Sequence, residues 1–142
     1  MGAFAGVLAL AGVLARSLGR DPRGETTLDL AVLSVATFKT ARTISRDDVT
    51  SFIRAPFVDA EGDHEQPLET GGLQQAIGEL VTCSRCVGTW AAAGLATTQI
   101  LAPRFGRLLT WSLAAAGAND FLQAGFVALT RKTNELEERS PS

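Results

Sequence analysis

The stretch from Glu79 to Trp90 reads ELVTCSRCVGTW and contains both cysteines of the chain, Cys83 and Cys86. It marks the place where a polar segment of about forty residues gives way to an apolar one. Outward from it, charge is concentrated in residues 45–85 and 131–142 and almost absent from residues 1–15, 87–103 and 108–130. Segregated blocks of this kind are typical of a membrane protein with polar loops.

The apolar runs predict four membrane-spanning helices, over residues 2–18, 27–44, 87–103 and 108–130. The first would reach about 26 Å as a helix, slightly short of a hydrocarbon core of about 30 Å. A signal segment is the alternative for residues 2–18, but no Lys or Arg precedes the apolar run. We therefore expect an all-α integral membrane bundle that forms a single domain over residues 1–130.

The central segment, residues 45–86, is expected to be a polar loop with one or two short amphipathic helices. Within it, the acidic residues 58–70 indicate a mobile solvated loop. Residues 131–142 are expected to be a charged, flexible tail. The distribution of Lys and Arg favours both termini and the 45–86 loop on the cytoplasmic side.

The Cys83-Ser84-Arg85-Cys86 motif has three interpretations. As a redox pair, Cys83 at a helix amino terminus beside Arg85 would have its thiolate favoured. As a zinc site the pair supplies only two of the four usual ligands, so a second protomer would have to complete it. The third interpretation is a pair of small thiols packed at the start of a helix.

A polar cluster interrupts the apolar run 108–130 at Asn119, Asp120 and Gln123. A carboxylate inside an apolar helix is costly unless it is paired, hydrated or protonated. The structural interpretation pairs Asp120 with Lys39 or Arg42 of another helix, and the functional one is an ion or proton path. The net charge of −2 argues against nucleic acid as a partner.

Four blocks occur in order along the chain: ATFKTAR at 36–42, DVTSFIRAPF at 48–57, GELVTCSRCVGTW at 78–90 and ANDFL at 118–122. This set resembles the bacterial domain-of-unknown-function 1360 family of small membrane proteins, which includes a sporulation-associated member. The resemblance covers residues 28–125. It departs from the family pattern at Phe38, where His is usual, and at Ser84-Arg85, where Pro and an aromatic residue are usual.

The resemblance implies a multi-pass protein of the bacterial cell membrane and no known reaction. It makes one constellation of Lys39, Arg42, Arg54, Cys83, Cys86 and Asp120. In it, Arg54 and Glu79 mark the loop junction, and Arg54 is expected to bridge to residues 82–83.

The sequence favours a non-enzymatic structural subunit or assembly factor of a membrane complex, because no complete catalytic set is present. Its partners would be the lipid bilayer and either another protein or further copies of this chain. One alternative is a membrane thiol-redox or metal-binding protein that uses Cys83 and Cys86, with zinc as the metal. The other is a small transporter or proton pathway through Asp120.

Overall fold

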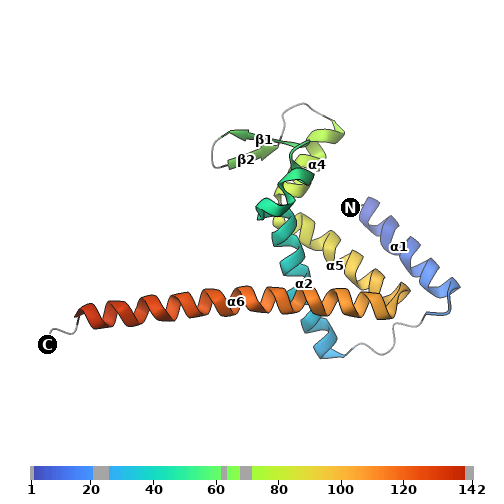
Figure 1. Cartoon of the computed structure of the whole chain (residues 1–142). Helices are drawn as coiled ribbons and strands as arrows, with labels where there is room; N and C mark the ends of the chain where they lie inside the picture. Colours follow the sequence, from blue (N-terminus) through green and yellow to red (C-terminus); the bar gives the residue numbers. More distant parts are fainter. Residues whose placement is uncertain (1, 21–25, 62–63, 68–71, 140–142) are drawn as a thin grey trace.

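The computed structural model describes residues 2–20, 26–61, 64–67 and 72–139 of the chain (Figure 1). Its elements follow one another as α1 (Gly2–Ser17), α2 (Thr27–Arg46), the 3₁₀ turn η1 (Asp48–Thr50), α3 (Ser51–Arg54), β1 (Val58–Glu61), β2 (His64–Pro67), α4 (Leu73–Thr82), α5 (Ser84–Leu101) and α6 (Pro103–Arg139). The helical character predicted from the sequence is present, together with one small hairpin.

Helix α2 begins at a capping box, which is a reciprocal pair of hydrogen bonds at a helix start. The amide of Asp29 donates to Thr26 Oγ1 at 3.2 Å, and the amide of Thr26 donates to Asp29 Oδ2 at 3.0 Å. The Thr26 amide and hydroxyl, with Arg107 nearby, lower the pKa of the Asp29 carboxyl below its ordinary value. The N-cap of α2 is therefore Thr26.

The core lies where α2, α5 and α6 cross, and two alanines and one leucine are its buried centre. Ala36 of α2, Leu95 of α5 and Ala114 of α6 are buried together there. Around them pack the partly buried residues Val32, Leu33, Val35, Leu109 and Leu113. Figure 1 shows α2 running steeply across α6 at this point. Small residues allow the three backbones to approach closely.

Two glycines make the close approach of α6 possible. A Cβ on Gly106 would lie 2.5 Å from Gln99 Cα, inside the backbone of α5. A Cβ on Gly117 would lie 3.0 Å from Val35 Cγ1 and 3.2 Å from Lys39 Cβ, on α2. Glycine at these positions therefore fixes how α6 sits against its two neighbours.

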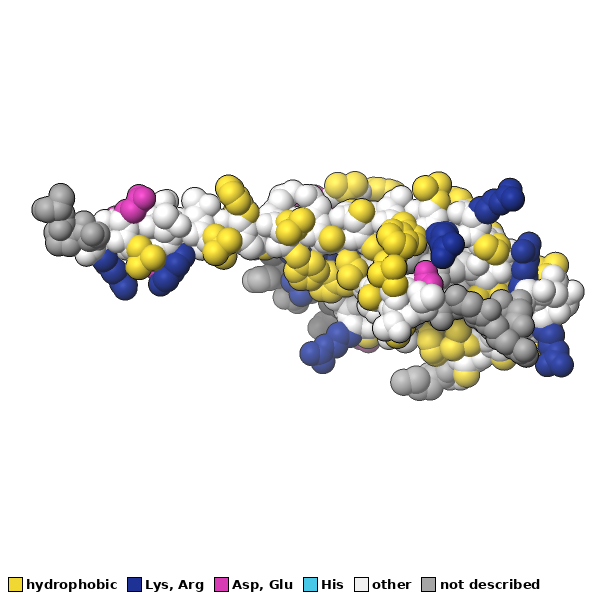
Figure 2. All heavy atoms as spheres, turned by 90° about the horizontal axis from the view of Figure 1, so that it is seen from below, with side chains coloured by type: hydrophobic (Ala, Val, Ile, Leu, Met, Phe, Trp, Pro, Cys, Tyr) yellow, Lys and Arg dark blue, Asp and Glu magenta, His cyan; other side chains and the backbone are white. Residues whose placement is uncertain are grey.

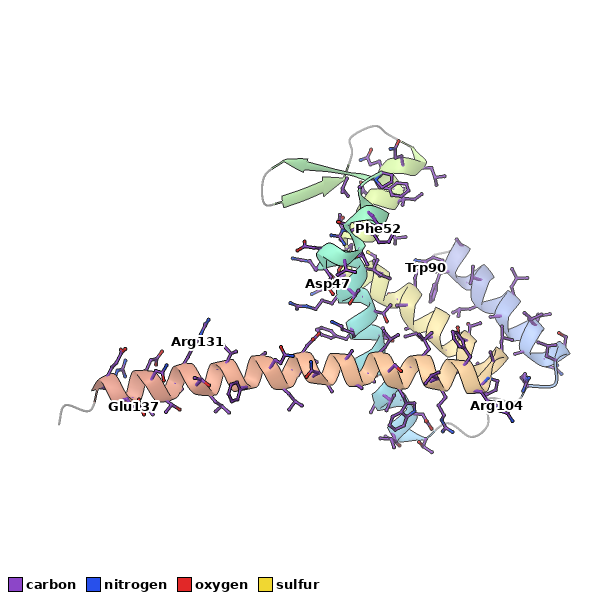
Figure 3. The ribbon with its side chains drawn as sticks, in the orientation of Figure 1. Asp47, Phe52, Trp90, Arg104, Arg131 and Glu137 are labelled. Carbon is purple, nitrogen blue, oxygen red and sulfur yellow. The ribbon has the colours of Figure 1, made fainter. Side chains whose placement is uncertain are left out.

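Helix α1 packs on α5 through one aromatic contact. The Phe4 and Trp90 rings meet edge to face with centroids 5.2 Å apart. Figure 3 shows Trp90 between the two helices. Most of the other α1 side chains are exposed, with Ala15 the buried exception among those described.

Residues 58–67 contain a hairpin where the sequence predicts a mobile loop. Strands β1 and β2 pair antiparallel, with Val58 opposite Pro67 and Glu61 opposite His64. Val58 is buried. Pairing through backbone groups does not require the alternation of apolar side chains on which strand prediction relies.

The predicted membrane-spanning bundle is contradicted. Within the described ranges, no helix is both long enough and apolar enough to cross a membrane. Helix α1 has 16 residues, about 24 Å at 1.5 Å per residue. Helix α2 has 20 residues, but Asp29, Lys39, Arg42 and Arg46 lie within them.

The two remaining predicted spans, in α5 and α6, also contain too many polar or charged residues to cross a membrane. Helix α5 carries Arg85 near its start and Thr97, Thr98 and Gln99 near its end. Helix α6 is longer, with 37 residues, but polar and charged side chains are spread along it.

The predicted multi-pass location in a bacterial cell membrane, with cytoplasmic termini and loop, is therefore wrong by this finding. The expected lipid-bilayer partner rests on the same spans and loses its support. The transporter or proton-pathway alternative requires an intramembrane Asp120, so it loses its premise.

Helix α6 extends well beyond the rest of the molecule (Figures 1 and 2). We call residues 125–139 the α6 arm; all of its residues are exposed. The structure has residues 131–139 in this helix, where the sequence predicts the start of a flexible tail. Residues 140–142 lie outside the described ranges, and flexibility of the tail stays a prediction.

Candidate functional site at the junction of α2 and α5

Cys83 is the single residue between α4 and α5, and it caps the start of α5. Its backbone is extended, and its Sγ accepts a hydrogen bond from the Cys86 amide at 3.3 Å. A side-chain acceptor at this position satisfies one of the free amides of the first helical turn. Glu79–Trp90 is thus a junction between two helices, as the sequence predicts.

The two thiols differ in their electrostatic environment. Hydrogen bonds from the Cys86 thiol, and then from the Cys86 backbone amide, lower the pKa of the Cys83 thiol, and Arg85 adds to the effect. The same interaction between the thiols raises the pKa of Cys86. Both cysteines are free; Cys83 is half-buried and Cys86 is exposed. The pair therefore combines a more acidic thiol with one that holds its proton.

Arg54 caps the carboxyl end of α2. Only 2% of its surface is exposed. Its Nη1 donates to the carbonyl of Ile44 at 2.8 Å, to that of Asp47 at 3.1 Å and to Thr50 Oγ1 at 2.8 Å. A cation that binds the last carbonyls of a helix compensates both unpaired acceptors and the helix dipole. These bonds connect Arg54 to the end of α2. The predicted bridge from Arg54 to residues 82–83 stays a prediction.

A pair of hydroxyls joins α2 to the start of α5. Ser45 Oγ and Ser84 Oγ lie 2.7 Å apart, and Ser45 is buried. Beside this pair a groove of about 810 Å³ opens between the two helices. Its polar lining comes from residues of both helices: Ser34, Thr37, Arg42, Arg46, Ser84 and Arg85. The junction therefore places three arginines around one groove.

The polar cluster predicted around Asp120 is centred on an ion pair. Lys39 Nζ lies 2.9 Å from Asp120 Oδ2 and 3.9 Å from Asp47 Oδ2. Of the two cations considered for Asp120, the structure places Lys39 there. Arg42 lines the groove of about 810 Å³ between α2 and α5, and it also lines a smaller pocket of about 340 Å³ beside Asp120.

The other cluster residues lie apart from this ion pair. Asn119 and Gln123 are exposed on α6. Glu79 is exposed on α4 and accepts a hydrogen bond from Gln75 Nε2 at 3.1 Å. A functional role for the cluster, and for Arg54 and Glu79, stays a prediction.

The described residues contain no group of three or more His, Cys, Asp or Glu side chains that could hold one metal ion. A zinc ion at Cys83 and Cys86 would need ligands from outside these residues or from another chain. The zinc hypothesis stays a prediction.

Sequence reasoning missed the grouping of Arg46 with Arg42 and Arg85. Arg42 and Arg46 are four residues apart and therefore share a face of α2. That spacing is the signal that was available. Its link to Arg85 needed the packing of α2 on α5.

Comparison with known proteins matches the chain to one family model and to two relatives. A family model described as "Protein of unknown function (DUF1360)" matches residues 32–126. The chain is 33% identical over 98 residues to "Sporulation protein YjcA" of Bacillus subtilis (strain 168), covering 63% of this chain and 83% of that protein. It is 29% identical over 102 residues to "UPF0713 protein YngL" of the same organism, covering 68% of this chain and 76% of that protein. No solved structure matches the chain.

Proposed function

We infer that this chain, which belongs to the DUF1360 family, is a non-enzymatic structural subunit that pairs with a second copy of itself through α6. One relative of this chain is named a sporulation protein, a name that gives a cellular process and no reaction. A structural role agrees with a name of that kind. The observation that carries the proposal is the exposed face of α6.

A stripe of residues runs along α6 with alternating spacings of three and four, the pattern of a coiled-coil seam. We call it the α6 stripe; it consists of Phe105, Leu108, Ser112, Ala115, Asn119, Leu122, Phe126, Leu129, Thr133 and Leu136. All ten are exposed, and Leu122 and Leu129 are exposed to 73% and 71%. Seven of the ten are apolar.

The α6 stripe faces away from the core. The α6 residues buried against α2 and α5 are Gly106, Thr110, Ala114 and Gly117, and none of them belongs to the stripe. At 3.6 residues per turn these two sets lie on opposite sides of the helix. A partner helix therefore has access to the stripe without displacing any packed element.

The heptad positions favour a parallel pair of identical helices. In heptad notation Leu108, Leu122, Leu129 and Leu136 occupy d positions, and Asn119 occupies an a position near the middle. Leucine at d is typical of two-stranded coiled coils, and one buried Asn at a specifies register at some cost in stability.

Charge complementarity also favours the second copy. Lys132 takes a g position and Glu137 the following e position, so in a parallel pair Lys132 of one chain lies opposite Glu137 of the other. Lys132 also lies 3.7 Å from Glu135 of its own helix, an exposed pair that contributes little. Figure 3 shows Glu137 standing free on the α6 arm.

Sedimentation velocity of the full chain over a range of concentrations tests the proposal. We expect a dimer, and we expect Leu129→Asp to shift it to monomer because a charge would enter the seam. Val127→Asp is the matched control, since Val127 is also exposed and apolar on α6 but lies off the stripe. A monomer at all concentrations, or equal dissociation by both variants, would contradict the proposal.

A charge swap tests the parallel orientation. Lys132→Glu places two acids opposite each other and should weaken the dimer several-fold, and adding Glu137→Lys in the same chain should restore it. Failure of the second change to restore dimerisation, with the dimer otherwise intact, would exclude the parallel register.

A second candidate function rests on the unequal thiols at the α4–α5 junction. The Cys83 thiolate would attack a disulfide substrate and release one thiol, and the Cys86 thiolate would then displace the other. The net reaction converts one protein dithiol and one substrate disulfide into one protein disulfide and two thiols. The lowered pKa of Cys83 and the raised pKa of Cys86 support this division of roles.

The pH profile of alkylation by iodoacetamide tests the thiol candidate, because only the thiolate reacts. Cys83, followed in Cys86→Ser, should react at lower pH than Cys86, followed in Cys83→Ser. Cys86→Ala removes the thiol that donates to Cys83, so the pKa of Cys83 should rise and its profile should move to higher pH. Identical profiles for the two cysteines would rule this candidate out.

A further inference from the structure

The groove between α2 and α5 has the lining of an anion site. It holds about 810 Å³, within the range of roughly 300–1,000 Å³ typical of small-molecule sites. Arg42 and Arg46 of α2 and Arg85 of α5 contribute to its wall. We propose that this groove binds a small organic phosphate, with the phosphate group held by the three arginines. This inference is independent of the α6 stripe and goes beyond the structural role proposed above.

The charges of the three arginines are available to a ligand. In the part of the chain that the structure describes, Arg42, Arg46 and Arg85 form no ion pair with a carboxylate. Among the described residues, no Asp or Glu lines the groove. All three residues are exposed, so their guanidinium groups need no buried partner in the absence of ligand. Guanidinium groups bind phosphate oxygens in pairs, which makes arginine the preferred side chain for such sites.

The hydroxyl lining adds hydrogen-bonding groups beside the arginines. Ser84 is the first residue of α5, and its Oγ is already paired with Ser45 Oγ at 2.7 Å. A hydroxyl pair retains one donor hydrogen or lone pair for a further partner. The positive end of the α5 dipole also lies at this edge of the groove.

The helix amides themselves contribute little to the site. Cys83 Sγ already accepts a hydrogen bond from the Cys86 amide at 3.3 Å. The side chains, rather than the backbone of the first turn, therefore carry the binding of the anion.

The rest of the groove is apolar, and this favours an organic phosphate over inorganic phosphate as the ligand. Phe38 and Ala41 of α2 and Gly88 of α5 form this part of the wall. The Phe38 ring is held by stacking on Phe121, with centroids 5.3 Å apart. A phosphate ion alone would leave the apolar wall in contact with water, whereas an aromatic or aliphatic group on the phosphate would cover it.

Isothermal titration with phenyl phosphate tests the proposal on the full chain, with inorganic phosphate and phenol as the comparison probes. We expect phenyl phosphate to bind at least tenfold more tightly than inorganic phosphate, and phenol to show no binding. Because charge carries the phosphate contact, the affinity should fall as salt is raised. Equal affinity for phenyl phosphate and inorganic phosphate would overturn the role of the apolar wall.

Substitution of the arginines locates the site. Arg46→Gln and Arg85→Gln should each weaken phenyl phosphate binding about tenfold, which corresponds to about 1.4 kcal/mol. Arg131→Gln is the matched control, since Arg131 is exposed on the α6 arm, away from α2 and α5, whose residues line the groove (Figure 3). Circular dichroism and the denaturation midpoint establish that each variant is folded.

Two outcomes would overturn the proposal. One is an absence of phenyl phosphate binding at millimolar concentration by folded protein. The other is an equal loss of affinity in Arg131→Gln and Arg46→Gln, which would reduce the interaction to general charge attraction.

Discussion

The two ends of α6 belong to one continuous helix, but the first is packed against α2 and α5 and the second is exposed. Residues 103–118 contain Gly106 and Gly117, at which α5 and α2 come so close that a Cβ has no room. In the α6 arm, Gly125 has nothing within 4 Å of the place where its Cβ would be. Packing within one chain thus determines the first part of α6. In a single chain the second part is supported by helix propensity and by the exposed Lys132–Glu135 pair. The same substitution should therefore have opposite effects at the two ends.

Gly106→Ala should produce the largest effect on stability. Its Cβ would meet the backbone of residues 98–99 at 2.5–2.7 Å, and backbone cannot move aside as a side chain can. We expect a loss of about 3 kcal/mol in the free energy of unfolding. Urea denaturation followed by circular dichroism measures it. Gly94→Ala in α5, where the added Cβ meets nothing within 4 Å, is the control. Unchanged stability in Gly106→Ala would contradict the close approach of α5 and α6.

Gly117→Ala should have a smaller effect of the same sign. Its Cβ would crowd Val35 and Lys39 at 3.0–3.2 Å, so α2 and α6 would have to separate slightly. Overpacking costs roughly 1–3 kcal/mol, and the better helix propensity of alanine returns about 1 kcal/mol. We expect a net loss of about 1 kcal/mol in the same denaturation measurement. A net gain would mean that α2 yields at the crossing without cost.

Gly125→Ala should stabilise the chain. The position is exposed and helical, so alanine removes the entropic cost of glycine without a steric conflict. The expected gain is about 0.5–1 kcal/mol, seen as a higher melting temperature or higher helicity of the α6 arm. If melting of the arm is uncoupled from the core, only the helicity signal will rise. A loss of stability would show that this part of α6 is packed against something.

Asp120→Asn should have the smallest effect, at the boundary between the two parts of α6. It removes the ion pair with Lys39, in which the side chains are 21% and 41% exposed. Partly exposed ion pairs are worth about 0.2–1 kcal/mol, because water and salt screen them. The difference from the unchanged chain should shrink as salt is raised from low to high concentration. A salt-independent loss would indicate that Asp120 acts through hydrogen bonds rather than through charge.

Local chemistry made some features predictable from the sequence. Thr26 with Asp29 three residues later is a complete helix-start signal, and the structure uses it as a capping box. The junction at Cys83 follows from the change of composition around it. The Lys39–Asp120 pair follows from the scarcity of opposite charges on two apolar helices.

Other features depend on contacts that a linear pattern does not contain. The hairpin of β1 and β2 forms in an acidic stretch because backbone groups pair with each other, whatever the side chains. Helix α6 passes Arg131 without ending, because exposed helical charges are tolerated and can pair three residues apart, as Lys132 and Glu135 do. The sequence predicts membrane spans from apolar blocks, but no helix of the described residues is both long enough and apolar enough to cross a membrane. In α2, for example, charged side chains lie within the predicted span as well as beyond it. The sequence marks Arg54 as a loop-junction residue, but its bonds to the carbonyls that end α2 depend on how the chain turns after Arg46.

The α6 arm is also a lever. Its 15 residues, 125–139, reach about 22 Å at 1.5 Å per residue, and the nearest tight crossing with another helix is at Gly117. Measured from that crossing, Arg139 lies about 33 Å away along the axis, so a swing of 10° there would carry the tip through roughly 6 Å. A small change in the angle at which α2 packs on Gly117 therefore produces a larger displacement at the far end of α6. A fluorophore placed near Arg139 would report sub-ångström changes in the core as displacements of several ångströms.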